Sequence, residues 1–124
     1  IYVSDLGLLC AKKDVVPEDV LYSSSELNDF KGAMSENYVD TQLVANGYTP
    51  YYWESDREAE VDFVIQRQGR LIPIEVKSAD NTRAKSLMVY MDAYHPDYAI
   101  KISAKNFAFE DNKKIIPLYA AFCI

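Results

Sequence analysis

Apolar and polar residues alternate along two neighbouring stretches of the chain, residues 60–66 and 71–77. Alternation with a period of two residues on either side of a glycine-containing turn is typical of a β-hairpin. Gln68-Gly69 can close the hairpin as a two-residue turn, and a four-residue loop over 67–70 gives the same register. The pattern therefore predicts two antiparallel strands with one fixed pairing.

That pairing brings like charges together. Asp62 is expected to lie opposite Glu75, and Glu60 opposite Lys77, with all four side chains on one face of the hairpin. Opposed side chains have Cβ atoms roughly 5 Å apart, and like charges at that separation destabilise a sheet. Two carboxylates there need a cation between them or a raised pKa. Oxygen ligands from two strands suit Mg²⁺ or Mn²⁺. The alternative is a solvated face on which Glu60 and Lys77 form a surface ion pair of little energetic weight.

The remaining pattern predicts helices on both sides of this hairpin. Apolar residues recur at helical spacing along 28–46 and 83–94, with Thr82 as a cap of the second helix and His95-Pro96 as its end. The other expected elements are a short strand and turn over 1–10, a loop or broken helix over 11–25, an aromatic core strand over 48–55, a strand over 98–103 and one or two strands over 115–124. The third and fourth strands of the core must be joined through the second helix, which makes them parallel. The expected fold is α/β, a mixed central sheet with a helix packed on each side.

Glu36 lies on an apolar face of the first predicted helix, between Gly32 and Val39. A carboxylate on such a face is costly unless a charged group receives it. Glu36 is therefore a candidate third ligand or orienting acid for the hairpin site. The alternative is a side chain that reaches solvent from the edge of the apolar stripe.

Composition bounds the class of protein. The chain has 124 residues, 49% of them hydrophobic and 26% charged, which suits one globular domain, and it contains no apolar run long enough for a membrane helix. Cys10 and Cys123 lack the spacing of metal ligands and are expected to be buried free thiols in a reducing cytoplasm. The chain begins at Ile1 in the middle of an apolar stretch, and we expect it to be a fragment of a longer protein.

The net charge of −6 argues against strong non-specific binding to nucleic acid. The two halves differ, however. Residues 1–62 contain 13 acidic and four basic residues, whereas residues 63–124 contain six acidic and nine basic ones. A surface that faces phosphate groups is therefore expected in the second half, and its candidate residues are Arg67, Arg70, Lys77, Arg83, Lys85 and Lys101.

The order of elements, with Glu36 on the first helix, Asp62 on the second strand and Glu75-Val76-Lys77 on the third, resembles the PD-(D/E)XK nuclease superfamily. Local motifs are similar to one branch, the C-terminal domain of unknown function of bacterial and archaeal AAA-type ATPases. Those motifs are Tyr-Val-Ser-Asp-Leu-Gly-Leu-Leu at 2–9, Gly-Ala-Met-Ser-Glu-Asn-Tyr-Val at 32–39, Tyr-Trp at 52–53, Glu-Val-Asp-Phe-Val at 60–64 and Ile-Glu-Val-Lys at 74–77.

The resemblance implies a restriction-endonuclease-like αβββαβ core and one nuclease-like domain over residues 1–124. It implies that Asp62 and Glu75 bind Mg²⁺ or Mn²⁺, that Glu36 adds to the metal shell, and that Lys77 orients the attacking water. The chain departs from the superfamily pattern in having Val61, not proline, before Asp62. The second helix also lacks a glutamine, with Arg83 or Lys85 as substitutes. No phosphate-binding loop of the Gly-x-x-x-x-Gly-Lys-Ser/Thr type occurs, so ATP would bind only to an ATPase part that this chain lacks.

Two functions follow as hypotheses. The first is metal-dependent hydrolysis of DNA by a domain attached to an ATPase domain of the same chain, in the cytoplasm and away from membranes. The second is a catalytically inactive module that binds DNA or protein for the ATPase. A third hypothesis is a purely structural fragment that exposes a surface covered in the longer protein. It predicts dimerisation through residues 1–9 or 115–124.

Overall fold

The predicted hairpin lies within a six-stranded mixed sheet. A computed structural model describes residues 1–16, 18, 28–56, 58–77 and 84–124 of the chain. The strands are β1 (Tyr51–Glu54), β2 (Glu60–Arg67), β3 (Arg70–Val76), β4 (Ala99–Ser103), β5 (Ala108–Glu110) and β6 (Lys113–Pro117), in the spatial order β1-β2-β3-β4-β6-β5. The helices are α1 (Leu6–Lys12), α3 (Asn28–Ala45), α4 (Lys85–Tyr94) and the 3₁₀ helix η2 (Leu118–Cys123).

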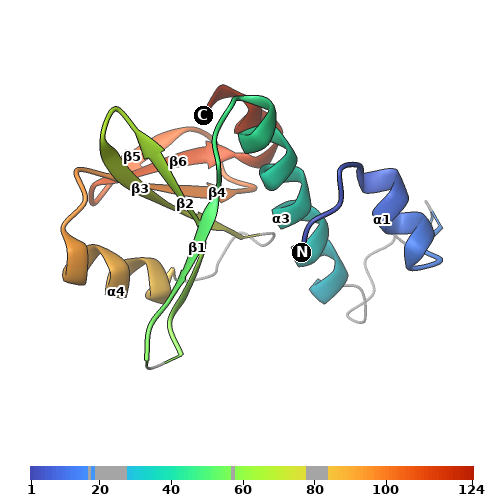
Figure 1. The fold of residues 1–124 in the computed structure, drawn as a ribbon, viewed down its shortest axis with the longest axis horizontal. Coiled ribbons are helices and arrows are strands. Elements are labelled where there is room, and N and C mark those ends of the chain that lie inside the picture. The colour runs from blue at the N-terminus through green and yellow to red at the C-terminus, as the bar shows by residue number, and fades with distance from the viewer. Residues whose placement is uncertain (17, 19–27, 57, 78–83) are drawn as a thin grey trace.

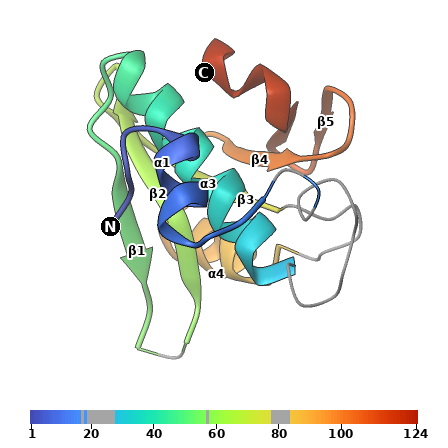
Figure 2. The same ribbon diagram turned by 90° about the vertical axis from the view of Figure 1, so that its right-hand side faces the viewer.

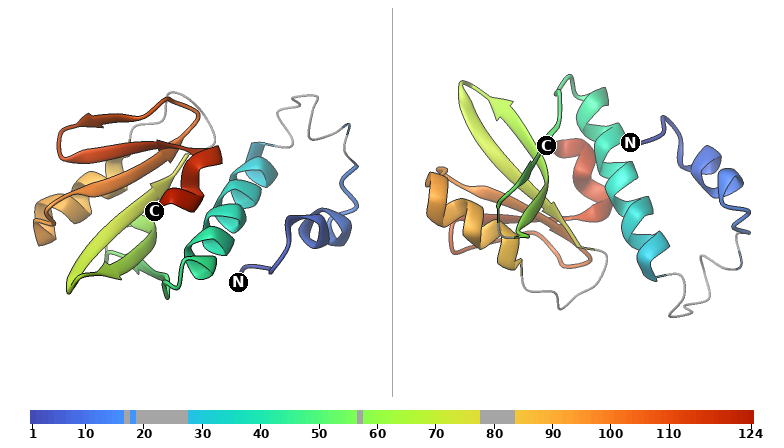
Figure 3. Two further views of the ribbon diagram at one scale, coloured as in Figure 1. Left: turned by 90° about the horizontal axis from the view of Figure 1, so that it is seen from above. Right: turned by 60° about the horizontal axis from the view of Figure 1, so that its bottom comes forward.

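The predicted order of the central elements is confirmed, since the chain runs α3-β1-β2-β3-α4-β4. Strands β1, β2 and β3 are antiparallel neighbours, and β3 and β4 are parallel, as a connection through α4 requires. The helices form layers on the two faces of the sheet (Figures 1 and 3), with α4 on one side, α3 and η2 on the other, and α1 outside α3. The fold class is therefore mixed α/β with flanking helices.

Each helix layer has its own core. The face toward α3 buries the larger cluster, which includes Val39, Leu43, Phe63, Ile65, Ile72, Ile74, Val76, Ile100 and Ile102. The face toward α4 buries Val61, Val64, Ala84, Leu87, Tyr90 and Ala99. Successive residues of a strand point to opposite faces, so these two clusters show which side chains of β3 and β4 face α3 and which face α4.

Pro73 occupies a fully buried position in the central strand β3. Proline cannot donate a ladder hydrogen bond and is normally excluded from central strands. Here it lies opposite Val64 of β2, and the pairing of β3 with β4 begins only at the next residue, Ile74. The missing N–H therefore falls where neither neighbouring strand requires it.

The N-terminal prediction of a strand and turn is wrong over Leu6–Lys12, which form α1. Asp5 begins this helix, because its side chain accepts a hydrogen bond from the backbone N–H of Leu8 at 3.1 Å. In Figure 2, α1 lies in front of α3. The expected loop or broken helix over 11–25 falls largely outside the described residues.

The C-terminal prediction is correct for β6 and wrong beyond it. Leu118–Cys123 form a 3₁₀ helix instead of a strand, and β5, which pairs with β6, was not predicted. Short apolar runs do not distinguish a strand from a buried helical turn by periodicity alone. In the folded chain Ala120 and Ala121 are buried, and Asn46 at the end of α3 donates hydrogen bonds to the carbonyl oxygens of Phe122 and Ile124.

Strand β1 is shorter and more exposed than expected. The predicted core positions of Tyr51 and Tyr52 are wrong, since their side chains are 63% and 70% exposed. β1 is an edge strand, and Trp53 alone among these three aromatics is half-buried, where it packs edge-on against Tyr90 of α4.

Both cysteines are free, as predicted, but the expectation that they are buried is wrong. Cys123 is exposed and Cys10 is partly so. The predicted second helix is confirmed from Lys85 onward, whereas Thr82 and Arg83 lie outside the described residues. Among the described residues, no helix combines the length and apolarity needed to cross a bilayer.

Candidate active site

The predicted register of the hairpin is confirmed from Arg67, opposite Arg70, as far as Phe63, opposite Ile74. Asp62 and Glu75 come directly after the last of these pairs. The pairing of β2 with β1 also shifts between Tyr51 and Trp53, across the stretch of β2 that contains Asp62. An irregularity of this kind re-aims side chains. The predicted direct pairing of Asp62 with Glu75 is therefore absent from the described ladder.

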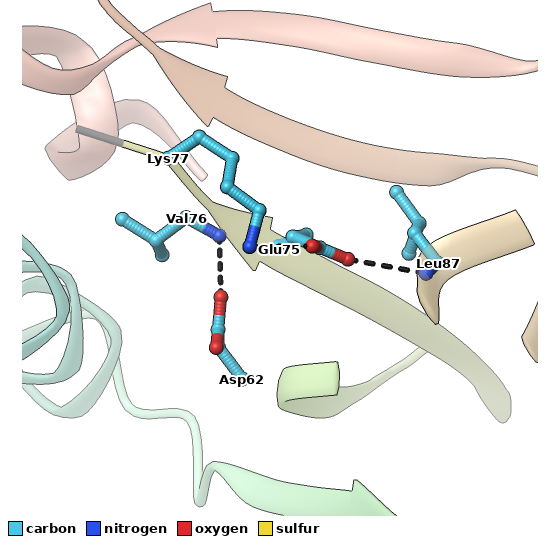
Figure 4. A network of polar contacts seen from close by, with 5 residues as sticks. All are labelled: Asp62, Glu75, Val76, Lys77 and Leu87. Atoms are coloured by element: carbon cyan, nitrogen blue, oxygen red, sulfur yellow. Dashed lines mark hydrogen bonds and ion pairs between the residues drawn. The ribbon is translucent and has the colours of Figure 1, made fainter. Parts of the chain in front are cut away.

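Asp62 instead binds the backbone of β3. Its Oδ2 accepts a hydrogen bond from the N–H of Val76 at 2.7 Å (Figure 4). The carboxylate of Asp62 accepts the N–H that a backbone carbonyl of β2 would accept in a regular sheet. This hydrogen bond holds the Asp62 side chain just beyond the last described pair of β2 and β3, Phe63 and Ile74.

Glu75 is held from the side of α4. Its side chain is 3% exposed, Oε2 accepts the N–H of Leu87 at 3.1 Å, and Oε1 lies 2.7 Å from Nζ of Lys77. The backbone of Lys77 is fixed as well, since its N–H donates to the carbonyl of Ile102 in β4 at 2.8 Å. Figure 4 shows the Lys77 ammonium directed back along β3, beside Glu75 and near Asp62. The alternative in which Lys77 pairs with Glu60 is wrong: Lys77 pairs with Glu75, and Glu60 is exposed.

Glu36 of α3 joins this group electrostatically. Burial, and to a smaller extent the charge of Glu60, raise the pKa of Glu36 above its usual value. The charge of Lys77 and hydrogen bonding with Tyr2 oppose this rise without cancelling it. Glu36 is half-buried. The prediction that this acid faces the hairpin site is consistent with its interaction with Lys77.

Tyr2 belongs to the same place and was missed. Its ring packs against Phe63 with centroids 5.4 Å apart, and burial, followed by the charges of Glu36 and Asp62, raises the pKa of its hydroxyl. The segment that carries Tyr2 is held by Asn37, which is 2% exposed and binds both the N–H and the carbonyl of Val3 at 2.8 Å. Because Val3 and Asn37 are 34 positions apart, the local pattern gave no signal of this contact. The only pointer was the Tyr-Val-Ser-Asp motif.

Burial and neighbouring negative charges make Asp62 a weaker acid than an ordinary aspartate. Burial raises the pKa of its carboxyl to about 6, against the lowering effect of the Val76 N–H; the charges of Glu36 and Glu75 raise it further and that of Lys77 lowers it. Burial alone would lower the pKa of Lys77, but its hydrogen bond and charge interaction with Glu75 raise it overall. At neutral pH the cluster of Glu36, Asp62, Glu75 and Lys77 therefore contains a charged ammonium, that of Lys77, and a carboxyl, that of Asp62, whose pKa lies about one unit below the pH.

The donor chemistry of this cluster fits a hard divalent cation, since carboxylate oxygens are the ligands that Mg²⁺ and Mn²⁺ prefer. The geometry is closed, however, because both oxygens of Glu75 have partners. Within the described parts of the chain, no group of three or more His, Cys, Asp and Glu side chains is gathered as a metal site. Metal binding would require Lys77 to give up or share Oε1 of Glu75.

The other candidate cations lie elsewhere. Arg67 and Arg70 are at the exposed end of the hairpin, where Arg70 forms an ion pair with Asp97. Arg83 falls outside the described residues. His95 ends α4 with a φ of 47°, and its N–H donates to the carbonyl of Met91, which is a structural role. Lys85 and Lys101 lie near the cluster on the α4 side of the sheet.

Comparison with known families gives one match. The family model described as a domain of unknown function (DUF4143) matches residues 31–121. The matched range contains Glu36, Asp62, Glu75 and Lys77, and Tyr2 precedes it. A search among curated proteins finds no significant match.

Proposed function

The chain belongs to the DUF4143 family of domains of unknown function, and we propose that it is a nuclease-like domain that hydrolyses phosphodiester bonds of DNA with Mg²⁺ or Mn²⁺. One observation carries this proposal. Glu36, Asp62 and Glu75 interact with a single lysine, Lys77, in a partly buried place where two strands separate. Burial, with the charges of Glu36 and Glu75 as smaller causes, raises the pKa of Asp62 to about 6. Groups with strongly shifted pKa values gather at functional sites.

The resemblance to the PD-(D/E)XK superfamily supports the same function. We propose that α3-β1-β2-β3-α4-β4 is a restriction-endonuclease-like αβββαβ core, with Asp62 near the start of β2 and Glu75 near the end of β3 as the acids that the superfamily uses. We further propose that this domain is the C-terminal part of a cytoplasmic AAA-type ATPase. In that protein ATP would bind to the N-terminal ATPase domain, which would be the partner of this domain in the same chain.

Each residue has a distinct role in the proposed reaction. Asp62 and Glu75 would hold the divalent cation, and Glu36 would support it or its water. A bound Mg²⁺ or Mn²⁺ would polarise a phosphoryl oxygen and lower the pKa of a coordinated water. Asp62 must be deprotonated to bind a cation, which its pKa of about 6 permits at neutral pH.

Lys77 contributes a positive charge, and both its backbone and its ammonium group are held in place. Its backbone is bonded to β4, and its ammonium lies 2.7 Å from Glu75. With a cation held by Asp62 and Glu75, the ammonium of Lys77 would be available to orient the attacking water and to offset the charge that develops at phosphorus. The 2.7 Å ion pair is in this proposal the resting state of the site.

A thermal melting series with millimolar Mg²⁺ or Mn²⁺ tests the proposal. A ligand that binds the folded state raises the melting temperature. We expect a rise of several degrees for the wild type and none for Asp62→Ala. Asp92→Ala, which removes an exposed acid of α4, is the matched control and should respond like the wild type. A flat response of the wild type would contradict metal binding.

A second function, a catalytically inactive module that binds DNA or protein, is favoured by a different observation. Both oxygens of Glu75 are already engaged by Lys77 and Leu87, which is how a purely structural ion pair would look. This function predicts no metal response, and it predicts that Lys77→Ala alters stability without altering any DNA chemistry.

A further inference from the structure

Three lysines from different elements surround one hollow on the α4 side of the sheet. The hollow has a volume of about 520 Å³. It is lined by the N-cap residue Ala84, by Lys85 and Met88 of α4, by Lys101 of β4, by Asp111 between β5 and β6, and by Lys113 of β6. We refer to it as the lysine hollow. Its size falls in the range of ligand pockets, roughly 300–1,000 Å³, and exceeds what one phosphate group fills.

The register of the sheet explains why the lysines meet. Ile100 and Ile102 belong to the core under α3, so Lys101 between them faces α4. Ala99 belongs to the core under α4 and pairs with Lys113, which therefore faces the same side. Lys85 is the first residue of α4 and completes the group from above the sheet.

The described lining of the hollow contains more basic than acidic residues. Among the described residues that line it, three are lysines and one, Asp111, is an acid. Lys113 binds this residue, with Nζ 3.2 Å from the backbone oxygen and 3.5 Å from Oδ2 of Asp111. Asp111 is 89% exposed, so water screens its charge. In a chain with a net charge of −6, this local excess of positive charge selects an anionic ligand.

The lysine hollow adjoins the candidate active site. Lys101 pairs directly with Glu75 across β3 and β4, and neighbouring strands are about 4.8 Å apart. Leu87, whose N–H binds Glu75, is two residues beyond Lys85 in the first turn of α4. The lysine hollow therefore lies on the same face of the sheet as Glu75, with Lys101 one strand away from it.

We propose that the lysine hollow binds the phosphate backbone of a DNA strand next to the strand's reacting phosphodiester. This inference rests on the proposed function, because it takes the Glu75–Lys77 pair as the reaction centre. The lysines contact phosphates and not base edges, so they position the strand without reading its sequence. A polynucleotide fits better than a single phosphate because the charges come from three elements around a larger volume.

Binding without metal tests this inference separately from catalysis. The experiment measures fluorescence anisotropy of labelled single- and double-stranded DNA with the full chain in EDTA, over a series of salt concentrations. The test variant is Lys85→Gln/Lys101→Gln/Lys113→Gln. The control variant, Lys12→Gln/Lys13→Gln/Arg67→Gln, removes the same charge from exposed positions on α1 and at the hairpin end. Each neutralised phosphate contributes about 0.9 to the slope of log affinity against log salt for duplex DNA, or about 0.7 for single strands.

We expect the test variant to lose roughly 2–3 from the magnitude of that slope on duplex DNA and the control variant to keep it. Equal losses in both variants would show that net charge alone acts, and would overturn the inference. Complete displacement of DNA by millimolar inorganic phosphate would also overturn it, in favour of a small-anion site. The single variant Lys85→Gln, at an exposed position, should lose about 0.9 and serves if the triple variant does not fold.

The two proposals fail separately. An unchanged slope in the test variant, together with a metal response that depends on Asp62, removes the lysine hollow and leaves the proposed function. A reduced slope without any metal response or cleavage leaves a DNA-binding surface and removes the catalytic proposal.

Discussion

The ammonium of Lys77 lies 2.7 Å from Oε1 of Glu75, a carboxylate that is almost completely buried between β3 and α4. The two residues are separated by one position on a strand, so their side chains leave the sheet on the same face. Asp62 and Glu36 also interact electrostatically with Lys77. The ion pair is therefore the centre of both the stability and the proposed chemistry of the cluster.

Lys77→Met should destabilise the fold. The change keeps most of the aliphatic stem and leaves a buried carboxylate without its cation, which we expect to reduce the free energy of unfolding by about 1–3 kcal/mol. Urea unfolding at pH 7.5 measures this, with the exposed Lys12→Met as control. The double variant Lys77→Met/Glu75→Gln should recover part of the loss, because it removes the unpaired charge. A loss equal to or larger than that of the single variant would contradict the pairing.

The pKa of Asp62 predicts an unusual dependence of stability on pH. The carboxyl titrates at about 6 in the folded chain and near 3.8 when unfolded, so between these values the folded state holds a proton that the unfolded state has lost. Stability should therefore fall as the pH rises from about 4 to 6, by roughly 2–3 kcal/mol. Glu36, whose pKa is also raised, adds to this in the same direction.

Asp62→Asn isolates that contribution. The amide oxygen can still accept the N–H of Val76, but folding at neutral pH no longer buries a negative charge at this position. We expect the variant to be more stable than the wild type at pH 7.5, with a smaller decline between pH 4.5 and 7.5, both measured by urea unfolding. Asp92→Asn on the exposed face of α4 should leave the wild-type profile in place. A variant less stable than the wild type at pH 7.5 would refute the assignment.

Tyr2→Phe removes only a hydroxyl from the candidate site. The ring should keep its contact with Phe63, so the free energy of unfolding should change by no more than about 1 kcal/mol. Because hydrogen bonding with Tyr2 lowers the pKa of Glu36, the variant should raise that pKa. Carbon-13 NMR of the glutamate carboxyl groups across a pH titration measures the shift. An unchanged titration of Glu36 would place the Tyr2 hydroxyl outside the site.

Asn37→Ala should detach the segment that carries Tyr2. The side chain of Asn37 supplies two hydrogen bonds to Val3 from a buried position, and their loss should cost about 1–2 kcal/mol. Contacts between the rings of Tyr2 and Phe63 in NOE spectra should weaken at the same time. Asn46→Ala, which removes hydrogen bonds at the other end of α3, should leave those contacts unchanged. Contacts that persist in Asn37→Ala would show that the segment is held by other means.

The hairpin could be predicted because its information is local. Period-two alternation fixes which residues face the core, and the two positions of the turn, Gln68 with a φ of 52° and Gly69 with a φ of 77°, fix the register from Arg67 and Arg70 inward. The helices α3 and α4 could be predicted for the same reason, since their apolar spacing is continuous over many residues.

The detailed site could not be predicted, because it depends on contacts that no local pattern encodes. The Asp62 carboxylate binds the Val76 amide in a stretch where the β1–β2 register is irregular, and helix α4 supplies the N–H that binds Glu75. Tyr2 reaches the cluster from a segment distant in sequence, whose backbone is bonded to Asn37. Alternation singled out Asp62 and Glu75, and the fold determined what each of them binds.

Cleavage of labelled DNA in Mn²⁺ by the full-length protein and by its Lys77→Ala variant tests the central claim most directly. The claim is that Asp62, Glu75 and Lys77 form a working phosphodiesterase site. We predict cleavage of single- or double-stranded DNA by the wild type, its loss on adding EDTA, and its loss in Lys77→Ala when the variant still melts cooperatively. Cleavage that persists undiminished in the folded variant, or no cleavage by the wild type on either substrate, would contradict it.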